Sequence, residues 1–253
     1  MRGAPGCGSA SGWQPFELGA GVLGAFTGRA GGVSCAPYGT LNMSGAVGDE
    51  DDAVRRNREL VAAACGLSAA NMAWMHQVHG SDVVRVRRDC SPAPPLADAI
   101  FTDTPDTALC VLVADCAPVL MADPLARIAG AAHAGREGMA AGVVPALVAA
   151  MCGAGAAPAR MRAVIGPSIC GGCYEVPAAL HDRVAATVPQ ASCVTRAGTP
   201  GIDIRAGVEA QLAASGVRSV TGDRRCTAET PDLFSYRRDG STGRFTGLVW
   251  LAP

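Results

Sequence analysis

The residues of this sequence best suited to chemistry are His79, Cys116 and His133, each at the end of a short apolar run. His79 stands in MHQVHG, Cys116 in VADCAPV and His133 in AAHAG. Two neutral imidazoles and one thiolate could hold zinc and leave its fourth position open, as catalytic zinc sites do. The separations of 37 and 17 residues match no local ligand motif. Spacing alone therefore leaves unrelated, hydrogen-bonded core residues as the simpler interpretation.

A metal-free cysteine hydrolase is the alternative chemistry for the same residues. An adjacent imidazole lowers the pKa of a thiol, and the thiolate is the nucleophile. Asp115 and His76 are the acid–base candidates nearest in sequence, and Asp115 could equally orient a ligand imidazole. The fourth histidine, His181, falls in a helical pattern of ordinary amphipathic spacing, and we interpret it as structural or surface-exposed.

A second feature is the arginine-rich segment FSYRRDGSTGR. Arg237, Arg238 and Arg244 bracket a Gly-rich turn whose backbone amides could help to hold an anion. A solvated hairpin turn explains the same composition. The entry into a helix at residues 135–138 could also direct amides at a phosphate.

The pair Cys170 and Cys173 matches the CxxC pattern of metal and redox sites. The sequence has no second CxxC, and the pair lacks the strand–helix context of thioredoxin. We interpret it as two packed thiols in a tight, Gly-rich turn. The chain has 11 cysteines, an odd number with irregular spacing, and mostly reduced thiols fit a cytoplasmic protein.

These residues must be positioned by alternating strands and helices. Short apolar runs between turn residues indicate buried strands, and apolar residues at helical spacing indicate helices. The expected strands are 83–86, 108–113, 119–122, 128–132, 161–165, 217–221 and 247–251, and the expected helices are 49–67, 138–151, 176–188 and 204–214. This alternation predicts an α/β (α+β) fold with mixed sheets. We expect one domain over residues 15–253 after a flexible N-terminus, residues 1–14.

Composition excludes several functional classes. The 21 basic residues are all arginine and balance 22 acidic ones, which argues against a nucleic-acid or membrane-binding surface. Without lysine, a Schiff base and a P-loop are both excluded. No apolar stretch is long enough to span a bilayer, and residues 1–20 lack the apolar core of a secretory leader. We expect a cytoplasmic protein, and a monomer as its simplest oligomeric state.

Eight segments, in order, resemble one known family. They are FTGRAGGVSCAPYGTLNM (26–43), GD with VRRNREL (48–60), QVHG (77–80), ADAIFTDTPDTAL (97–109), VADCAPVLMADP (113–124), GAAHAG (130–135), IGPSICGGCYEV (165–176) and FSYRRDGSTGR (234–244). Over residues 26–251 the sequence is similar to the laccase-domain family, long labelled multicopper polyphenol oxidases and now regarded as purine nucleoside phosphorylases. The resemblance implies a single domain of layered mixed sheets flanked by helices, related in shape to a class of cysteine hydrolases.

The resemblance also implies a site. The histidine of QVHG, the cysteine of ADC and the histidine of HAG would hold zinc, and they correspond to His79, Cys116 and His133. The implied activities are phosphorolysis of adenosine, inosine, guanosine and methylthioadenosine, with purine nucleosides and phosphate as partners, and hydrolytic deamination of adenosine. The side chains that such chemistry would recruit are Arg58, Arg237 or Arg238 for phosphate, Asn42 and Gln77 for ribose or base edges, and Asp115 or His76 for proton transfer.

The sequence departs from the family pattern at one place. The family usually reads HAGWRG, whereas this chain has Arg136 and Glu137 after HAG. Losing the aromatic side chain could alter substrate stacking, and Glu137 would oppose a phosphate held nearby. Three alternatives stand beside the phosphorylase hypothesis: a copper-dependent polyphenol oxidase, for which four histidines are few, the metal-free cysteine hydrolase, and a non-enzymatic scaffold with a structural zinc.

Overall fold

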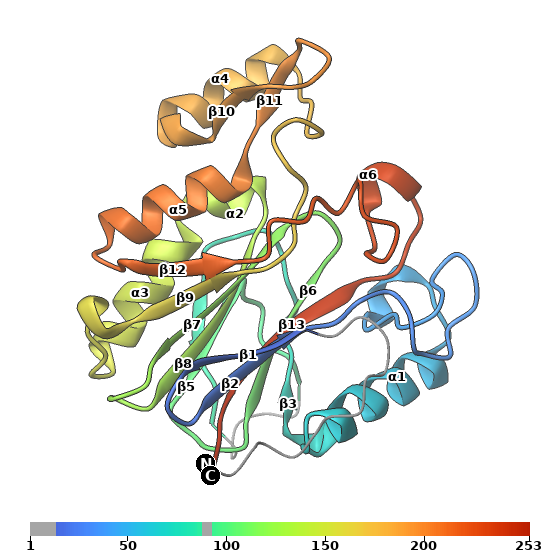
Figure 1. Ribbon diagram of the computed structural model, residues 1–253, viewed down its shortest axis with the longest axis vertical. Helices are drawn as coiled ribbons and strands as arrows, with labels where there is room; N and C mark the ends of the chain where they lie inside the picture. Colours follow the sequence, from blue (N-terminus) through green and yellow to red (C-terminus); the bar gives the residue numbers. More distant parts are fainter. Residues whose placement is uncertain (1–13, 88–92) are drawn as a thin grey trace.

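Two β-sheets lie face to face, and helices cover the outer face of each (Figure 1). The computed structural model describes residues 14–87 and 93–253. One sheet has the strand order β1 (Gln14–Gly19), β2 (Val22–Phe26), β13 (Phe245–Leu251), β6 (Ala108–Val113) and β3 (Met72–Ala73). The other has the order β12 (Ser219–Gly222), β9 (Arg162–Ile165), β7 (Ala117–Asp123), β8 (Ile128–Ala134), β5 (Ala99–Thr102) and β4 (Val83–Arg85). Both sheets mix parallel and antiparallel pairs, as the alternation of elements predicts.

Side chains of the central strands alternate between two apolar cores. In β7, Val119 and Met121 pack into the core beneath the outer helices, while Leu120 packs between the sheets. In β6, Leu109 and Val111 enter the same inter-sheet core. Because successive side chains of a strand point to opposite faces, a strand buried on both faces must be apolar throughout. This is why these strands read as unbroken apolar runs in the sequence.

Six α-helices, four short 3-10 helices and one small hairpin complete the described part of the chain. The helix α1 (Asp51–Ala64) covers the five-stranded sheet, and the helices α2 (Arg136–Ala141), α3 (Val143–Gly153) and α5 (Ile204–Ala214) cover the six-stranded one. The α3 residue Leu147 is fully buried, a change worth about 1.5–3 kcal/mol for such a side chain. The elements farthest from the sheets in Figure 1 are α4 (Ala178–Thr187) with the hairpin β10 (Ser192–Val194) and β11 (Pro200–Ile202), and α6 (Tyr236–Asp239).

The predicted elements are found, with two kinds of error. The single helix expected over 138–151 is two helices, because Gly142 adopts a left-handed φ of 84° that a continuous helix cannot include. The strands β1, β2, β3, β5, β10 and β11 were not predicted, since each is short or contains glycine or proline. Gln14 already belongs to β1, and the rest of the N-terminus expected to be flexible lies outside the described residues.

The connection from β6 to β7 passes from one sheet to the other, and it contains Ala114, Asp115 and Cys116. His133 is the penultimate residue of β8 and pairs with Pro118 of β7, so it lies beside the same connection. His79 lies in the segment between β3 and β4, which belong to different sheets. The sheet-to-sheet crossings therefore bring the three residues to one place. Among the described residues, no helix combines the length and the apolar character that crossing a membrane requires.

Candidate active site

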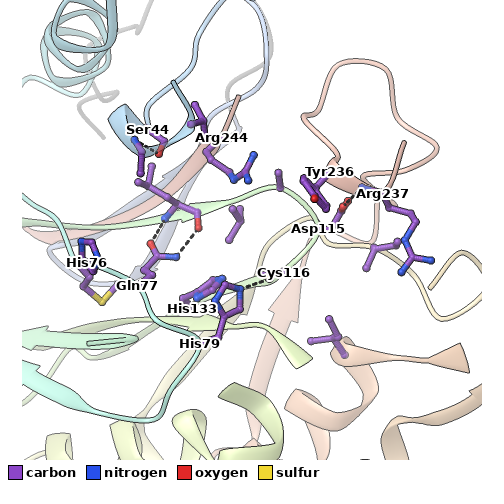
Figure 2. Close-up of a pocket in the computed structure, with 18 of the residues that line it drawn as sticks. Ser44, His76, Gln77, His79, Asp115, Cys116, His133, Tyr236, Arg237 and Arg244 are labelled. Carbon is purple, nitrogen blue, oxygen red and sulfur yellow. Dashed lines mark hydrogen bonds between the residues drawn. The ribbon is translucent and has the colours of Figure 1, made fainter. Parts of the chain in front are cut away.

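His79, Cys116 and His133 meet at one side of a cavity; we call them the first cluster (Figure 2). The His79 Nε2 atom lies 4.0 Å from the Cys116 Sγ atom. The two imidazole rings are 4.7 Å apart between centroids and stand edge to face at 76°. One donor atom from each residue lies within 4.8 Å of the other two. The structure thus assembles three residues that the sequence spreads over 55 positions.

Asp98 fixes the geometry of this cluster. Its carboxylate is fully buried and accepts a 2.8 Å hydrogen bond from the His133 Nδ1 atom, which leaves the Nε2 atom of that ring for the cluster. It also accepts hydrogen bonds from the backbone amides of Val78, His79 and Gly80, at 2.7–3.0 Å. One carboxylate therefore orients an imidazole on β8 and the loop that presents the other imidazole. Sequence reasoning missed Asp98, because only its position before a buried strand distinguishes it.

The electrostatics of the first cluster favour a thiolate. Burial alone raises the pKa of the Cys116 thiol, but His133 and then His79 outweigh this effect and lower the pKa to about 6. Burial conversely lowers the pKa of His133, whereas Cys116 and Asp98 raise it to about 9. Cys116 is therefore ionised at neutral pH, and a thiolate is the form that ligates metals or attacks carbon.

The backbone around the cluster tolerates little change. His79 and Asp115 have φ values of 61° and 101°, in the left-handed region that few residues other than glycine adopt. A Cβ atom on Gly135 would come within 2.9 Å of the His79 ring and 3.0 Å of the Cys116 sulfur. Glycine at position 135 is thus required by the close approach of the cluster, which explains its place after HA in the sequence.

The first cluster opens into a cavity of about 760 Å³, a size typical of small-molecule sites. Of the other residues predicted to act here, His76, Gln77, Asp115 and Arg237 line it. His76 is exposed. The Gln77 side-chain amide donates to the Leu112 carbonyl and accepts from the Leu112 amide, both at 2.8 Å. Gln77 therefore ties the His79 loop to β6, and that contact occupies both ends of its amide.

Asp115 lies in the cavity wall with its carboxylate engaged by the C-terminal segment. One oxygen accepts hydrogen bonds from the hydroxyl groups of Thr227 and Ser235, at 2.6 and 2.7 Å, and the other accepts from the Arg237 amide at 2.7 Å. These contacts place α6 against the cavity. For this segment the sequence allowed a solvated hairpin turn, and the structure has a short helix instead. The geometry makes Asp115 a positioning group for that wall.

Three predicted substrate residues do not line the cavity. Asn42 is fully buried; its amide bonds to Ser44 and to the backbone of Arg244, two residues that do line it. Arg58 donates to the Met43 carbonyl at 2.9–3.0 Å and stacks on Trp74 at 4.1 Å. Arg238 donates to the carbonyls of the loop before α6, those of Thr227, Thr230 and Leu233. All three therefore shape the segments behind the cavity.

Arg244 lines the cavity but was not among the side chains expected to bind substrate. Its Nη1 atom donates to the carbonyls of Thr242 and Gly243, and Figure 2 shows its guanidinium directed toward the cavity, opposite the first cluster. Burial lowers its pKa, yet an arginine remains charged. The sequence indicated an anion-binding role for it, because Arg244 follows the Gly-rich turn that Arg237 and Arg238 precede.

The departure from the family pattern lies beside the cavity. Arg136 forms an ion pair with Glu137 at 2.5 Å and donates to the Tyr174 hydroxyl at 3.3 Å. Tyr174 is a lining residue, whereas Arg136 and Glu137 are not. The positive charge of Arg136 is thus compensated by its neighbour, and its link to the site passes through Tyr174.

The donor set of the first cluster fits a zinc ion. Two imidazole nitrogens and a thiolate are preferred zinc ligands, with bonds of about 2.0–2.3 Å, and a three-ligand site leaves a position for water or substrate. The hydrogen bond from His133 to Asp98 is the outer contact that ligand histidines usually make. The three donor atoms also lie close enough together to contact one ion.

Comparisons with known proteins agree with this architecture. Residues 24–252 match the family model described as "Multi-copper polyphenol oxidoreductase laccase". A Streptomyces coelicolor protein named purine nucleoside phosphorylase is 52% identical over 89% of this chain and 94% of its own length. A Mycobacterium tuberculosis protein of the same name is 48% identical over 89% of this chain and 90% of its own length.

Solved structures extend the likeness to three dimensions. The Neisseria meningitidis protein NMB0706 matches with a TM-score of 0.86 and 37% identity, covering 95% of this chain and 99% of its own. YlmD from Geobacillus stearothermophilus matches with a TM-score of 0.86 and 31% identity, over 92% and 93% of the two chains. With nearly its whole length matched in sequence and in fold, this chain belongs to the laccase-like family of multi-copper polyphenol oxidoreductases, which includes proteins named purine nucleoside phosphorylase.

Proposed function

We propose that this protein is a zinc-dependent purine nucleoside phosphorylase that also deaminates adenosine. The observation that carries the proposal is the first cluster at one side of a 760 Å³ cavity, with Arg237 and Arg244 in the lining. A nucleoside needs a cavity of this size, and phosphate needs cationic donors beside the sugar. The substrates proposed are adenosine, inosine, guanosine and methylthioadenosine, and the names of the similar bacterial proteins support this class.

Phosphate would be bound by the two lining arginines. Arg237 is held over the Tyr174 ring at 5.0 Å and by its hydrogen bond to the Glu175 carbonyl. Arg244 is held by two backbone carbonyls. Guanidinium groups fixed in this way match the oxygens of a phosphate without a large loss of side-chain entropy. They would hold the anion where it can attack the C1′ atom as the base leaves.

The first cluster would hold the zinc ion through His79, Cys116 and His133. When bound, zinc supplies Lewis acidity that can activate water near neutral pH, which deamination at C6 of adenine requires. Asp98 keeps His133 in the tautomer that presents Nε2. His76, exposed in the lining, is the group proposed to move the proton, because the carboxylate of Asp115 already accepts three hydrogen bonds.

The test is to incubate purified protein with adenosine or inosine, with and without phosphate, and to separate the products by chromatography. We expect ribose 1-phosphate and free base only with phosphate, and inosine from adenosine in either case. Cys116→Ser should lose both activities, and Cys152→Ser, which alters a half-buried thiol outside the cavity lining, serves as the matched control. A protein that consumes no nucleoside under any of these conditions would contradict the proposal.

One observation favours a second candidate, a metal-free cysteine hydrolase. Cys116, His133 and Asp98 form a thiol–imidazole–carboxylate series in which the thiol pKa is lowered to about 6. Chelation separates the two candidates: it abolishes a zinc-dependent reaction and spares a hydrolase. A multicopper oxidase is less well supported by the side chains. Such sites use many imidazoles. His181, one of only four, lies on α4 and bonds to Asp182 of the same helix and to Ser192 of β10.

A further inference from the structure

A second group of ligand-type side chains lies outside the cavity lining. The Sγ atoms of Cys170, Cys173 and Cys226 and a carboxylate oxygen of Glu229 all lie within 4.8 Å of one another. We call these four residues the second cluster. Cys226 is buried, Cys170 and Cys173 are half-buried, and Glu229 is exposed. Three thiols and a carboxylate converging on one point are sufficient to complete a tetrahedral coordination shell.

The second cluster is built from two turns of the same form. In the first turn the amides of Cys173 and Tyr174 donate to the Cys170 carbonyl, and in the second those of Glu229 and Thr230 donate to the Cys226 carbonyl. Each turn thus presents its first and fourth residues together. The sequence pattern is C-x2-C followed by C-x2-E, the paired spacing of zinc sites with glutamate in the last place. Because glutamate stands where the fourth cysteine would be, the second half does not match the CxxC pattern.

The two turns are fastened to each other independently of any ion. The Cys170 amide donates to the Cys226 sulfur at 3.3 Å, and the Thr227 amide donates to the Ser168 carbonyl at 3.2 Å. Ser168 and Cys226 pair as an isolated parallel bridge. The positions of the donor atoms are therefore set by the backbone.

Arg196 supplies a positive charge beside the second cluster. Its guanidinium forms an ion pair with Glu229 and donates to the Cys173 sulfur at 3.2 Å. With a metal bound, three thiolates and a carboxylate would carry four negative charges, of which a divalent cation would neutralise two and Arg196 a third. N–H donors to thiolate sulfurs are the outer contacts that stabilise such a site.

We propose that the second cluster binds a zinc ion through Cys170, Cys173, Cys226 and Glu229, as a closed structural site separate from the first cluster. All four positions are taken by side chains, so no place remains for substrate. The ion would link two segments that contribute to the cavity wall. Tyr174, next to Cys173, lines the cavity, and Thr227, next to Cys226, donates to Asp115.

The test uses the full-length Cys116→Ser protein, in which the first cluster has no thiolate. Metal-free protein is titrated with Co²⁺ under anaerobic, reducing conditions, because thiolate ligation gives a charge-transfer absorption band. We expect a band that saturates at one Co²⁺ per chain and is displaced by one Zn²⁺. Adding Cys173→Ser should weaken Co²⁺ binding at least tenfold and reduce the band. Adding Cys193→Ser should change neither, although a Cβ atom on Gly171 would lie only 2.7 Å from the Cys193 sulfur.

The outcomes separate cleanly from those of the proposed function, because nucleoside turnover is not measured. Absence of the band in folded Cys116→Ser protein would overturn the proposal, and so would its loss on Cys193→Ser. A Cys170–Cys173 disulfide in protein purified anaerobically with reductant would also overturn it. If the Cys173→Ser protein fails to fold, the Cys116→Ser titration decides alone, and Glu229→Gln provides the ligand variant at an exposed position.

Discussion

The two cysteine-containing clusters of this protein differ in what surrounds the thiols. In the first cluster a single thiol faces two imidazoles, and its pKa falls to about 6. In the second cluster thiols face one another; burial, and then Cys170 and Cys226, raise the pKa of Cys173 to about 12. The same residue type is thus a thiolate in one place and a neutral thiol in the other. Neighbouring charges decide which form is present, and burial acts against the charged form in both.

Under the two proposals, this difference separates a catalytic site from a structural one. The first cluster has three donors, a buried carboxylate that orients one imidazole, and an open side toward the cavity. The second has four donors and an arginine that caps the sulfurs. Open three-ligand sites are typical of catalytic zinc, and closed four-ligand sites of structural zinc. The two clusters should therefore respond to mutation in opposite ways.

Replacing one thiol in each cluster should give the largest contrast. We expect Cys116→Ser to lower kcat/KM for phosphorolysis at least about 1000-fold, since it removes a ligand beside the reacting atoms. We expect Cys173→Ser to lower it less than about tenfold. The melting temperature should fall by about 5–15 °C in Cys173→Ser and only slightly in Cys116→Ser, because a structural zinc contributes to folding directly. Steady-state kinetics and thermal unfolding of both variants provide the measurement.

Cys152→Ser is the matched control, since it alters a half-buried thiol outside both clusters. Equal losses of activity and stability in the Cys116 and Cys173 variants would show that the clusters act as one unit and would contradict the distinction.

The orienting carboxylate of the first cluster should have the next largest effect. Asp98→Asn keeps the size of the side chain but replaces one carboxylate oxygen with an NH2 group, which cannot accept a hydrogen bond. The side chain can then no longer accept both from His133 and from the amides of Val78 and Gly80. We expect zinc affinity at the first cluster to fall about 10–100-fold. Affinity at the second cluster should be unchanged, and competition with a chromophoric chelator measures both. A fall at the second cluster would mean that Asp98 acts through the fold as a whole.

The sequence predicted the elements better than the side-chain environments. The unbroken apolar runs of β6, β7 and β8 indicate strands buried on both faces. The ends of these strands pointed to Cys116 and His133, which the structure brings together. Asp98 could not be found, because its role depends on the pairing of β5 with β8, a contact between residues 35 positions apart. The second cluster was missed for the same reason, since 56 positions separate Cys170 from Cys226.

The arginines illustrate a different limit. Arg58, Arg238 and Arg244 have the same chemistry, and composition cannot distinguish an arginine that binds carbonyls from one that faces a cavity. Only the packing of Trp74 and of the loop before α6 decides between them.

Acidification should weaken the second cluster more steeply than the first. Above pH 6 Cys116 is already ionised, so zinc binding displaces one proton, from His133, whose pKa is raised to about 9. Cys173 and Cys226 have raised pKa values and each must lose a proton on binding. Since each displaced proton changes the apparent affinity about tenfold per pH unit, lowering the pH from 8 to 7 should weaken the first cluster about tenfold and the second at least about 100-fold. Chelator competition on Cys173→Ser and Cys116→Ser proteins, each with one cluster intact, measures the slopes, and equal slopes would be the contrary result.

The smallest effect is expected at the contact of Arg136 with Tyr174. Arg136 follows the loop of His133, Tyr174 follows Cys173, and Glu137 compensates the arginine charge. Glu137→Gln removes that compensation and leaves a positive charge hydrogen-bonded to a residue of the cavity. Because Glu137 does not line the cavity and the ion pair is partly exposed, the gain for a bound anion should be about 0.3–1 kcal/mol. We therefore expect the phosphate concentration for half-maximal phosphorolysis to fall about two- to fivefold, while adenosine deamination, which uses no phosphate, stays unchanged.

Initial rates over a phosphate series, with Arg136→Gln as the opposing variant, measure this effect. An unaltered phosphate dependence in both variants would show that the charge of Arg136 does not affect phosphate binding.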